Sequence, residues 1–533
     1  MKPSVPLLLC AAITATAANA DHGHDEQRRI NDIVVSSPLL PMPHSDHTLA
    51  GDALQQRRNA TSDSAGLLSS LPGVSATSAG AISSLPQLRG LGDDRVKIDL
   101  DGVSLISACG NHMNPPLSYT DPSQIDELAV FVGVTPVAVG GDSIAGTIVV
   151  RSAAPQFSQS AQWISSGNLS SYYRSNGDGH GINVAINAAN QQLALRYEGS
   201  VAAANNYSAA SHFKAAGAAA SGRGYLAGDE VGSTAFESHN HALRIDSAGD
   251  QHRFGLDIGY QHIPYQGFPN QRMDMLDNTS YRAALRHSGE YHWGSVASRL
   301  YWENTEHFMN FGPDKLFWYG TAAGMPMETE GTSRGVAVDI DYQLGTEQIV
   351  RFGGELQQYR LDDWWDASGG MMMAPDTFWN IRDGERDRNA LFVELQSRHS
   401  EQLSSLVGIR YEQVTSDAGE VQGYNAMYSG DADQFNALDR RQRDDNVDIS
   451  GQLSYQLAPG NQLKLGIARK VRSPNLYERY SWSNNGMAMR MINTVGDGNG
   501  YVGDVDLQPE IAHSVTADWT LTDSHADRWA VTL

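Results

Sequence analysis

The feature that most constrains this sequence is a long series of segments, from about residue 160 onward, in which apolar and polar residues alternate. Alternation with a period of two is typical of β-strands, because successive side chains point to opposite faces. Short turns alternate with long polar connections, which predicts a transmembrane antiparallel β-barrel, whereas a soluble β-sandwich would have shorter strands. We expect about fourteen strands, near residues 162–175, 180–188, 191–202, 239–247, 251–264, 279–288, 291–309, 333–344, 347–361, 387–398, 402–415, 446–457, 461–472 and 511–521.

The composition agrees with this fold and excludes two other classes of protein. Glycine is abundant at 52 of 533 residues and charged residues make up only 19% of the chain. The mean hydropathy is −0.38, and the one long apolar run lies at the N-terminus, so a helical membrane protein is excluded. The net charge of −23 leaves no basic surface for nucleic acid.

The N-terminus is predicted to be a secretory signal peptide, residues 1–20. Lys2 precedes a short apolar run that ends in Ala18-Asn19-Ala20, which is a typical cleavage site. Cys10 would be removed with the signal, so Cys109 is expected to be the only cysteine of the exported chain. A buried, inert thiol is the plain alternative for that residue.

Residues 51–152 have the mixed pattern of a small α/β domain, and residues 21–50 before them are polar. A short amphipathic helix over 65–71 is stopped by Pro72-Gly73, and a strand over 96–100 turns at Asp101-Gly102. The chain therefore divides into a compact domain at 51–152 and strands over 160–533.

The predicted strand 291–309 shows which face of the barrel carries polar chemistry. Leu300, Trp302 and Phe308 share the even-numbered face, which is expected to meet lipid. The odd-numbered face should line the lumen, and it carries Ser295, Arg299, Glu303, Thr305, His307 and Met309.

Several motifs resemble those of TonB-dependent outer-membrane receptors. They are Leu85–Gly90, Arg95–Val103 and Gly141–Ile148 in the small domain, and Arg472–Tyr480 and Leu507–Glu510 among the strands.

The resemblance implies a plug domain at 51–152 inside a β-barrel at 160–533, in the outer membrane of a Gram-negative bacterium and in contact with its lipid. Residues 21–50 would then be a periplasmic segment, with residues 32–36 placed like a TonB box. It also implies TonB, with the ExbB/ExbD energising complex, as the partner. We expect no enzyme, because no nucleophile–base arrangement is visible in the sequence.

The family's barrel has 22 strands, whereas about fourteen are counted here. We therefore expect this sequence to be truncated at its C-terminus, with roughly eight strands missing, since an open barrel edge in lipid leaves backbone groups unpaired.

Within the family, the segment 106–119 most resembles the copper-receptor branch, in which a C-x-x-x-M motif of the plug meets an H-x-M motif of the barrel. Here the first motif is Cys109 and Met113, and the second is His307 and Met309. In H-x-M on a strand, both donors point the same way into the lumen. A thiolate, two thioethers and an imidazole favour Cu(I), with Cu(II) possible as well, over hard cations such as Mg²⁺.

Two further observations bear on this site. His112 lies in the same loop and is a competing ligand that the family motif does not use. Methionines that we expect in solvated extracellular loops could capture copper at low affinity, although packing between loops is the alternative. They are Met273, Met275, Met325, Met327, Met371, Met372, Met373, Met487, Met489 and Met491.

The sequence thus predicts a receptor that imports a copper ion held between plug and barrel. Two alternatives stay open. One is a receptor for another metal or chelate, such as an iron–siderophore complex, zinc or cobalamin. The other is a surface binding protein only, used by a phage, a bacteriocin or an adhesion partner.

Overall fold

A computed structural model describes residues 45–78, 80–218, 224–319, 322–492, 499–522 and 528–532. The predicted signal peptide, the TonB-box-like segment 32–36 and most of residues 21–50 lie outside this part of the chain. Within it, none of the helices combines the length and the apolar character needed to cross a membrane.

The N-terminal part folds into a small domain around a five-stranded sheet with strand order β1-β6-β7-β4-β5. The sheet is antiparallel except for β4 and β7, which pair in parallel. Its apolar side chains form a core that includes Leu128, Val130, Ile148 and Val150. The elements are β1 (His47–Ala50), α1 (Gly51–Arg58), β2 (Val74–Ser78), β3 (Ser84–Leu88), the 3-10 turn η2 (Asp93–Arg95), β4 (Val96–Leu100), β5 (Val103–Ser104), the 3-10 turn η3 (Pro116–Tyr119), β6 (Ile125–Val132) and β7 (Gly146–Ser152).

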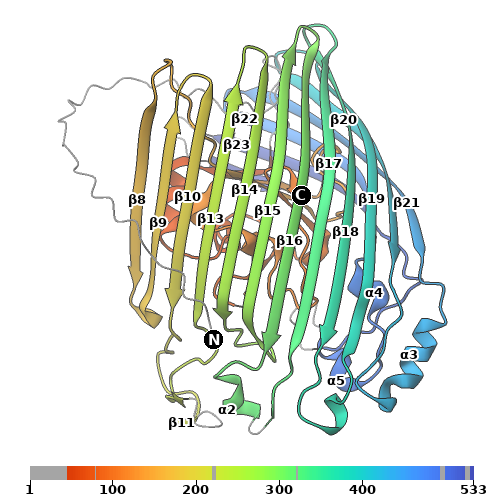
Figure 1. The fold of residues 1–533 in the computed structure, drawn as a ribbon. Coiled ribbons are helices and arrows are strands. Elements are labelled where there is room, and N and C mark those ends of the chain that lie inside the picture. The colour runs from red at the N-terminus through yellow and green to blue at the C-terminus, as the bar shows by residue number, and fades with distance from the viewer. Residues whose placement is uncertain are drawn as a thin grey trace. The chain divides into compact units, whose positions relative to one another are not determined.

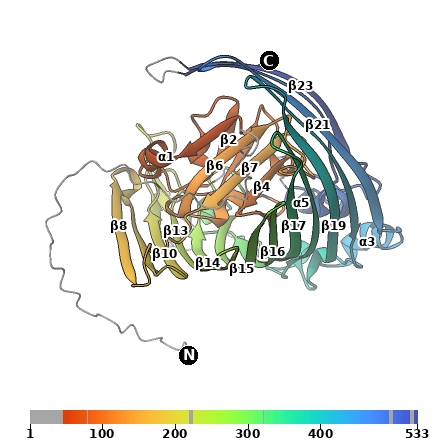
Figure 2. The same cartoon turned by 90° about the horizontal axis from the view of Figure 1, so that it is seen from above.

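Among the described residues that follow, one antiparallel sheet of 15 strands dominates, so the predicted fold class is confirmed (Figure 1). The sheet curves around the small domain, which lies against its concave face (Figure 2). Its strands are β8 (Ile164–Arg174), β9 (Gly179–Ala189), β10 (Leu193–Ala204), β13 (Phe236–Ala248), β14 (His252–Gln266), β15 (Asp274–Tyr291), β16 (Gly294–Asn310), β17 (Met327–Gln343), β18 (Gln348–Trp365), β19 (Phe378–Arg398), β20 (Leu403–Asp417), β21 (Gln442–Ala458), β22 (Asn461–Arg472), β23 (Glu510–Thr522) and β24 (Arg528–Thr532).

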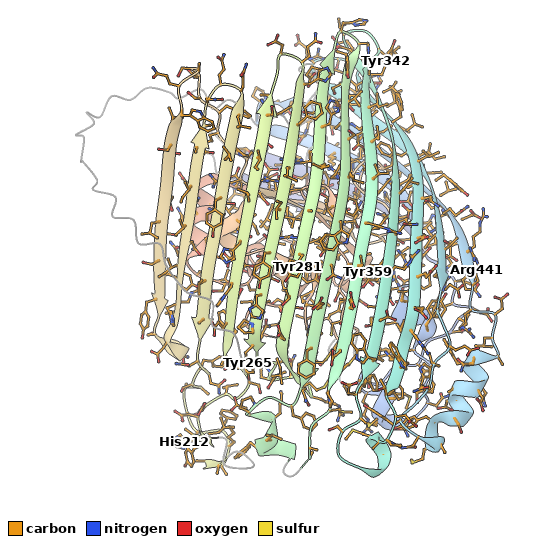
Figure 3. The ribbon with its side chains drawn as sticks, in the orientation of Figure 1. His212, Tyr265, Tyr281, Tyr342, Tyr359 and Arg441 are labelled. Carbon is orange, nitrogen blue, oxygen red and sulfur yellow. The ribbon has the colours of Figure 1, made fainter. Side chains whose placement is uncertain are left out.

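All fourteen predicted strands are present, and most of those from β13 to β21 begin or end well beyond the predicted bounds. Short turns join them at one end of the sheet, near Tyr342, and most of the connections at the other end, near His212, are long (Figure 3). The long connections carry a two-stranded sheet, β11 (Gly217–Ala218) with β12 (Tyr225–Leu226), and the helices α2 (Lys315–Tyr319), α3 (Ser429–Asn436), α4 (Leu476–Tyr480) and α5 (Gly486–Met489).

The two faces of the sheet differ as the alternating sequence predicts. On β16, Leu300 and Trp302 of the outer face are 55% and 43% exposed. The odd-numbered residues of β16 are mostly buried against the plug, including Tyr301, Glu303 and His307. The outer face is therefore the one suited to lipid, and the inner face carries the polar groups.

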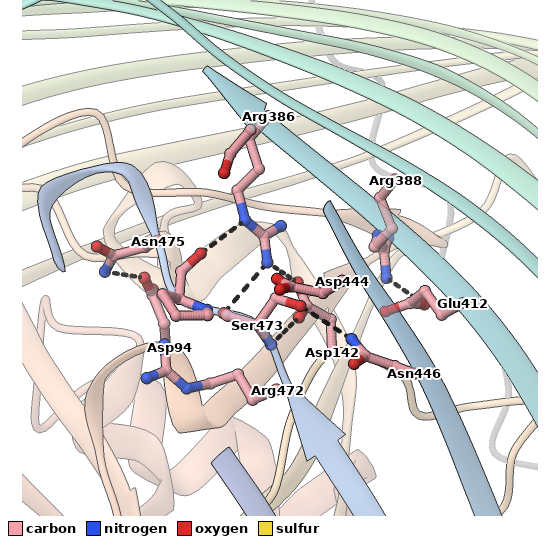
Figure 4. A network of polar contacts seen from close by, with 12 residues as sticks. Asp94, Asp142, Arg386, Arg388, Glu412, Asp444, Asn446, Arg472, Ser473 and Asn475 are labelled. Carbon is pink, nitrogen blue, oxygen red and sulfur yellow. Dashed lines mark hydrogen bonds and ion pairs between the residues drawn. The ribbon is translucent and has the colours of Figure 1, made fainter. Parts of the chain in front are cut away.

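Ion pairs fix the plug to the inner face of the sheet. Asp142 of the plug pairs with Arg386 of β19 at 2.5 Å, and its other oxygen accepts the backbone N–H of Ser473 (Figure 4). Nearby on the sheet wall, Arg388 pairs with Glu355 at 2.6 Å. The contacts of Asp142 hold its plug loop in a defined position against the barrel.

Candidate metal site

The loop between β5 and η3 carries the two plug donors of the predicted site, Cys109 and Met113. The loop is curled around the cysteine, whose sulfur accepts the backbone N–H of Asn111 at 3.4 Å and that of Met113. The Ser107 hydroxyl accepts the N–H of Cys109, and its one hydrogen lies between two acceptors, the Cys109 carbonyl at 3.2 Å and the Asn114 side-chain oxygen at 3.0 Å. These bonds give the loop one shape without help from a metal.

The two barrel donors, His307 and Met309, lie near the end of β16 from which a long connection leaves. Both point to the inner face, because they are two residues apart on one strand, while Phe308 between them is on the other face. Cys109, Met113, His307 and Met309 each expose 2% or less of their surface. All four predicted ligands are thus buried between plug and barrel.

Hydrogen bonds to Asn278 of β15 determine which nitrogen of His307 is available. The Nδ1 of His307 lies 3.2 Å from the Asn278 side-chain oxygen, which has no hydrogen to offer, so Nδ1 carries the proton. Among the described residues, Nε2 of His307 has no hydrogen-bond partner. A buried nitrogen with a free lone pair is costly to leave unsatisfied and is the form of imidazole that binds metals.

Direct contacts bring the plug loop to this part of the barrel. The Asn111 amide donates to the sulfur of Met309 at 3.7 Å, and the Asn114 amide donates to the Asn278 oxygen at 3.0 Å. Asn278 therefore accepts from a plug residue and from His307 at once, which joins the two halves of the site.

Two tyrosines of the barrel hold the same loop from the other side. The Tyr359 hydroxyl donates to the Ser107 carbonyl at 3.3 Å, and the Tyr477 hydroxyl donates to the Ala108 carbonyl at 3.1 Å. Glycine allows the close approach, since a Cβ at Gly110 would lie 2.8 Å from the Tyr477 ring.

Burial raises the pKa of the Cys109 thiol to about 12, and the charge of Asp363 acts in the same direction. The backbone N–H groups of Met113 and Asn111 oppose this effect without reversing it. The empty site therefore contains a neutral thiol at physiological pH, and a metal ion must displace its proton to bind a thiolate.

A row of methionines crosses the barrel wall beside the site. Met309 lies opposite Met275 of β15 on one side and opposite Met327 of β17 on the other, and all three are fully buried. A β-bulge between Met275 and Asp277 inserts one residue, which lets both Met275 and Asn278 face inward.

The predicted solvated position is wrong for five of the methionines, one of which is Met491 with 2% of its surface exposed. Met275 and Met327 belong to strands, because β15 and β17 begin before their predicted starts, and Met273 and Met325 next to them are also buried. These four pack in one apolar cluster with Cys109, Met113 and Met309. Met372, in contrast, is 45% exposed, and Met487 and Met489 are half-buried.

The sequence did not reveal Asn278, Asn111 or Asn114 as parts of the site. Their roles depend on strand register and on the bulge in β15, and neither of these can be predicted from a local sequence pattern. His112, the competing ligand of the plug loop, turns instead toward Asp93, with 2.5 Å between Nε2 and the carboxylate.

Comparison with known proteins supports the fold. The family model described as "TonB dependent receptor-like, beta-barrel" matches residues 224–533, and "TonB-dependent Receptor Plug Domain" matches residues 40–147. No curated protein matches the sequence.

Solved structures of similar fold include receptors with different cargo. The copper transporter OprC has 18% identity and a TM-score of 0.71 over 90% of this chain and 70% of its own. The FrpB iron transporter of Neisseria meningitidis (F3-3 variant) has 14% identity and a TM-score of 0.64 over the same shares. The hemophore receptor HasR of Serratia marcescens, in complex with its hemophore HasA and heme, has 12% identity and a TM-score of 0.66 over 92% and 72%.

The barrel match alone covers more than half of the chain, and the plug match accounts for the domain that packs inside the sheet. This family consists of transporters of the Gram-negative outer membrane, not enzymes, and their transport depends on TonB. The chain belongs to the TonB-dependent receptor family.

Proposed function

We propose that this receptor imports copper, bound as Cu(I) in preference to Cu(II), and that Cys109, Met113, His307 and Met309 hold the ion. The observation that carries the proposal is the Nε2 of His307, which is buried without a hydrogen-bond partner among the described residues, on the strand face that also carries Met309. An unsatisfied lone pair in that position has a physical reason if a cation occupies the space beside it.

The donor set favours copper over the cargo of the other structural relatives. Thioether and thiolate sulfur suit Cu(I), whereas thioether is a poor zinc ligand and hard cations prefer oxygen. Next to His307 the structure places the amide of Asn278, which also binds Asn114, and Met309 lies two residues along the same strand. The printed name of OprC, a copper transporter, agrees with this choice.

The methionines beside the site support a route by which copper enters it. The inward methionines Met275 and Met327 flank Met309 at the end of the barrel that bears the long connections. Each offers a neutral soft donor, so copper can pass to Met309 without binding a charged group on the way.

The four donors are divided between the plug and the barrel, and this division provides a way to release the copper ion. Cys109 and Met113 move with the plug, and His307 and Met309 stay with the barrel. We propose that TonB, driven by ExbB/ExbD, pulls on the periplasmic segment 21–50 through residues 32–36. Withdrawal of the loop breaks the Asn114–Asn278 and Asn111–Met309 contacts and leaves each half with only two donors.

The test is copper binding by the purified protein, with Ag⁺ as a redox-stable substitute for Cu(I). We expect one tight ion per chain, and loss of that ion in Cys109→Ala and Met309→Ala. Met427→Ala is the matched control, because this methionine is 63% exposed and should not contribute. Equal Ag⁺ binding by the native protein and both site variants would refute the proposal.

A further inference from the structure

A second group of metal-binding side chains lies in the plug, formed by His112 of the same loop and two aspartates of the turn η2, and it shares no donor with the proposed copper site. Asp93, Asp94 and His112 each present a ligand atom, and these atoms lie within 4.8 Å of one another. The Nε2 of His112 is 2.5 Å from Asp93 and 3.9 Å from Asp94.

The backbone fixes this convergence. Asp93 opens the turn η2 with φ of +63°, and His112 has φ of +49°, both in the left-handed region that side chains other than glycine rarely adopt. The His112 N–H donates to the Cys109 carbonyl at 3.0 Å, so the imidazole and the thiol project from one tight turn.

Space for an ion adjoins the three side chains. They line a cavity of about 80 Å³ between plug and barrel, which also reaches Cys109. A water molecule needs roughly 10–15 Å³ by the same measure, so the cavity has room for a cation with several waters. Asp94 stands at its edge, where its second oxygen accepts from Asn475 at 2.6 Å (Figure 4).

A simple ion pair does not satisfy His112. The side chain is 94% buried, and its Nδ1 has no hydrogen-bond partner among the described residues. A neutral imidazole that binds a cation through Nε2 leaves only an uncharged N–H without a partner.

The two arginines nearest to this group are themselves paired with glutamates. Arg95 and Arg472 form ion pairs with Glu510, and Arg472 pairs with Glu478 as well. Together with Asp93 and Asp94, this described group has four carboxylates and two guanidiniums.

We propose that Asp93, Asp94 and His112 form a second cation site, which binds a borderline divalent ion such as Zn²⁺ or Cu²⁺. Two carboxylates and an imidazole suit such ions, and the lack of sulfur disfavours Cu(I). The plug then carries two sulfur donors on one loop and a nitrogen–oxygen site that this loop forms with the turn η2.

The experiment uses Zn²⁺ alone as the probe, in calorimetric titrations of the purified full chain in detergent. The background is Cys109→Ala/Met309→Ala, which removes the sulfur site. We expect one Zn²⁺ per chain, and binding weakened at least ~10-fold by Asp93→Asn and by His112→Gln, since even the loss of outer partners costs about 10–100-fold. Asp126→Asn, an exposed plug aspartate, is the control and should bind as the background does.

Each outcome is decisive. A background protein that binds no Zn²⁺, or binds it equally after Asp93→Asn and His112→Gln, overturns the second site.

Co²⁺ in place of Zn²⁺ adds a spectroscopic readout. A thiolate-to-cobalt charge-transfer band in the Cys109-containing protein that persists in His112→Gln would place the ion at the sulfur site instead. The native protein with Asp93→Asn should still bind Ag⁺. If native protein binds Zn²⁺ here but no Ag⁺, the copper proposal fails and this one stands.

Discussion

At the scale of single residues, the proposed copper site depends on a side chain that binds no metal. Asn278 accepts from both His307 and Asn114, so it sets the tautomer of the imidazole and joins plug to barrel. We predict that Asn278→Ala lowers Ag⁺ affinity by about 10–100-fold, the usual cost of losing such a partner. Competition titrations measure the change.

Asn278→Asp keeps an acceptor oxygen for His307 and should recover part of the affinity. Asn304→Ala is the matched control on β16, since this asparagine bonds to Glu330 and Thr332 away from the site. Affinity in Asn278→Ala equal to that of the native protein would show that the imidazole is not held by this bond.

The thiol of Cys109 gives a second residue-scale prediction. Because burial raises its pKa to about 12, the thiol is protonated in the empty site, and copper must release that proton. Affinity should therefore rise with pH by close to tenfold per unit between about pH 6 and 8, for one proton released per ion. Calorimetry in buffers of different ionisation enthalpy counts the protons, and Cys109→Ala should lose this dependence. A pH-independent affinity would argue against a thiolate ligand.

The resemblance to family motifs pointed to Cys109, Met113, His307 and Met309, and the strand period predicted that His307 and Met309 share one face, since this period is a local property. Neither could place Asn278, which reaches His307 through the register of β15 against β16 and a bulge one residue long. Nor could they show that His112 turns toward Asp93, because that contact joins residues far apart in sequence.

At the scale of elements, alternation predicted the strands but not their full length. β15 and β17 continue beyond the predicted starts as far as Asp274 and Met327, because the plug and neighbouring loops cover their inner face with apolar groups. At the start of these two strands the alternating pattern is replaced by methionines. Residues whose sequence resembles that of a loop therefore belong to the barrel wall.

The plug loop lies close to β17, which leads to a prediction for a variant that keeps all four proposed metal ligands. A Cβ at Gly331 would lie 2.9 Å from the Tyr359 hydroxyl and 3.0 Å from the Cβ of Ala108. Gly331→Val should therefore push the loop away from His307 and weaken Ag⁺ binding at least ~10-fold, since donor groups tolerate misplacement of only about 0.5 Å.

Gly451→Val of β21 is the control for that variant. A Cβ there would lie 3.5 Å from Ile467, which is an ordinary contact. Binding in Gly331→Val that equals binding in Gly451→Val would show that loop position does not limit the site.

At the scale of the whole molecule, transport requires the two halves of the site to separate. A Cβ at Gly408 of β20 would lie 2.3 Å from a methyl group of the plug residue Val137, so cysteines at both positions are within reach of a disulfide. We predict that the oxidised Val137→Cys/Gly408→Cys protein still binds copper but does not release it, and that reduction restores uptake in cells. Uptake by the oxidised form at the native rate would exclude separation of this part of the plug from the wall.

The central claim is that sulfur from the plug and nitrogen from the barrel bind one copper ion. X-ray absorption at the copper edge, on the purified protein loaded with one Cu(I), tests it most directly. We predict sulfur scatterers at about 2.3 Å together with one imidazole nitrogen near 2.0 Å, by analogy with zinc–ligand distances. The sulfur signal should fall in Cys109→Ala, and the imidazole signal should vanish in His307→Ala. A first shell of oxygen and nitrogen alone, unchanged in both variants, would contradict the account.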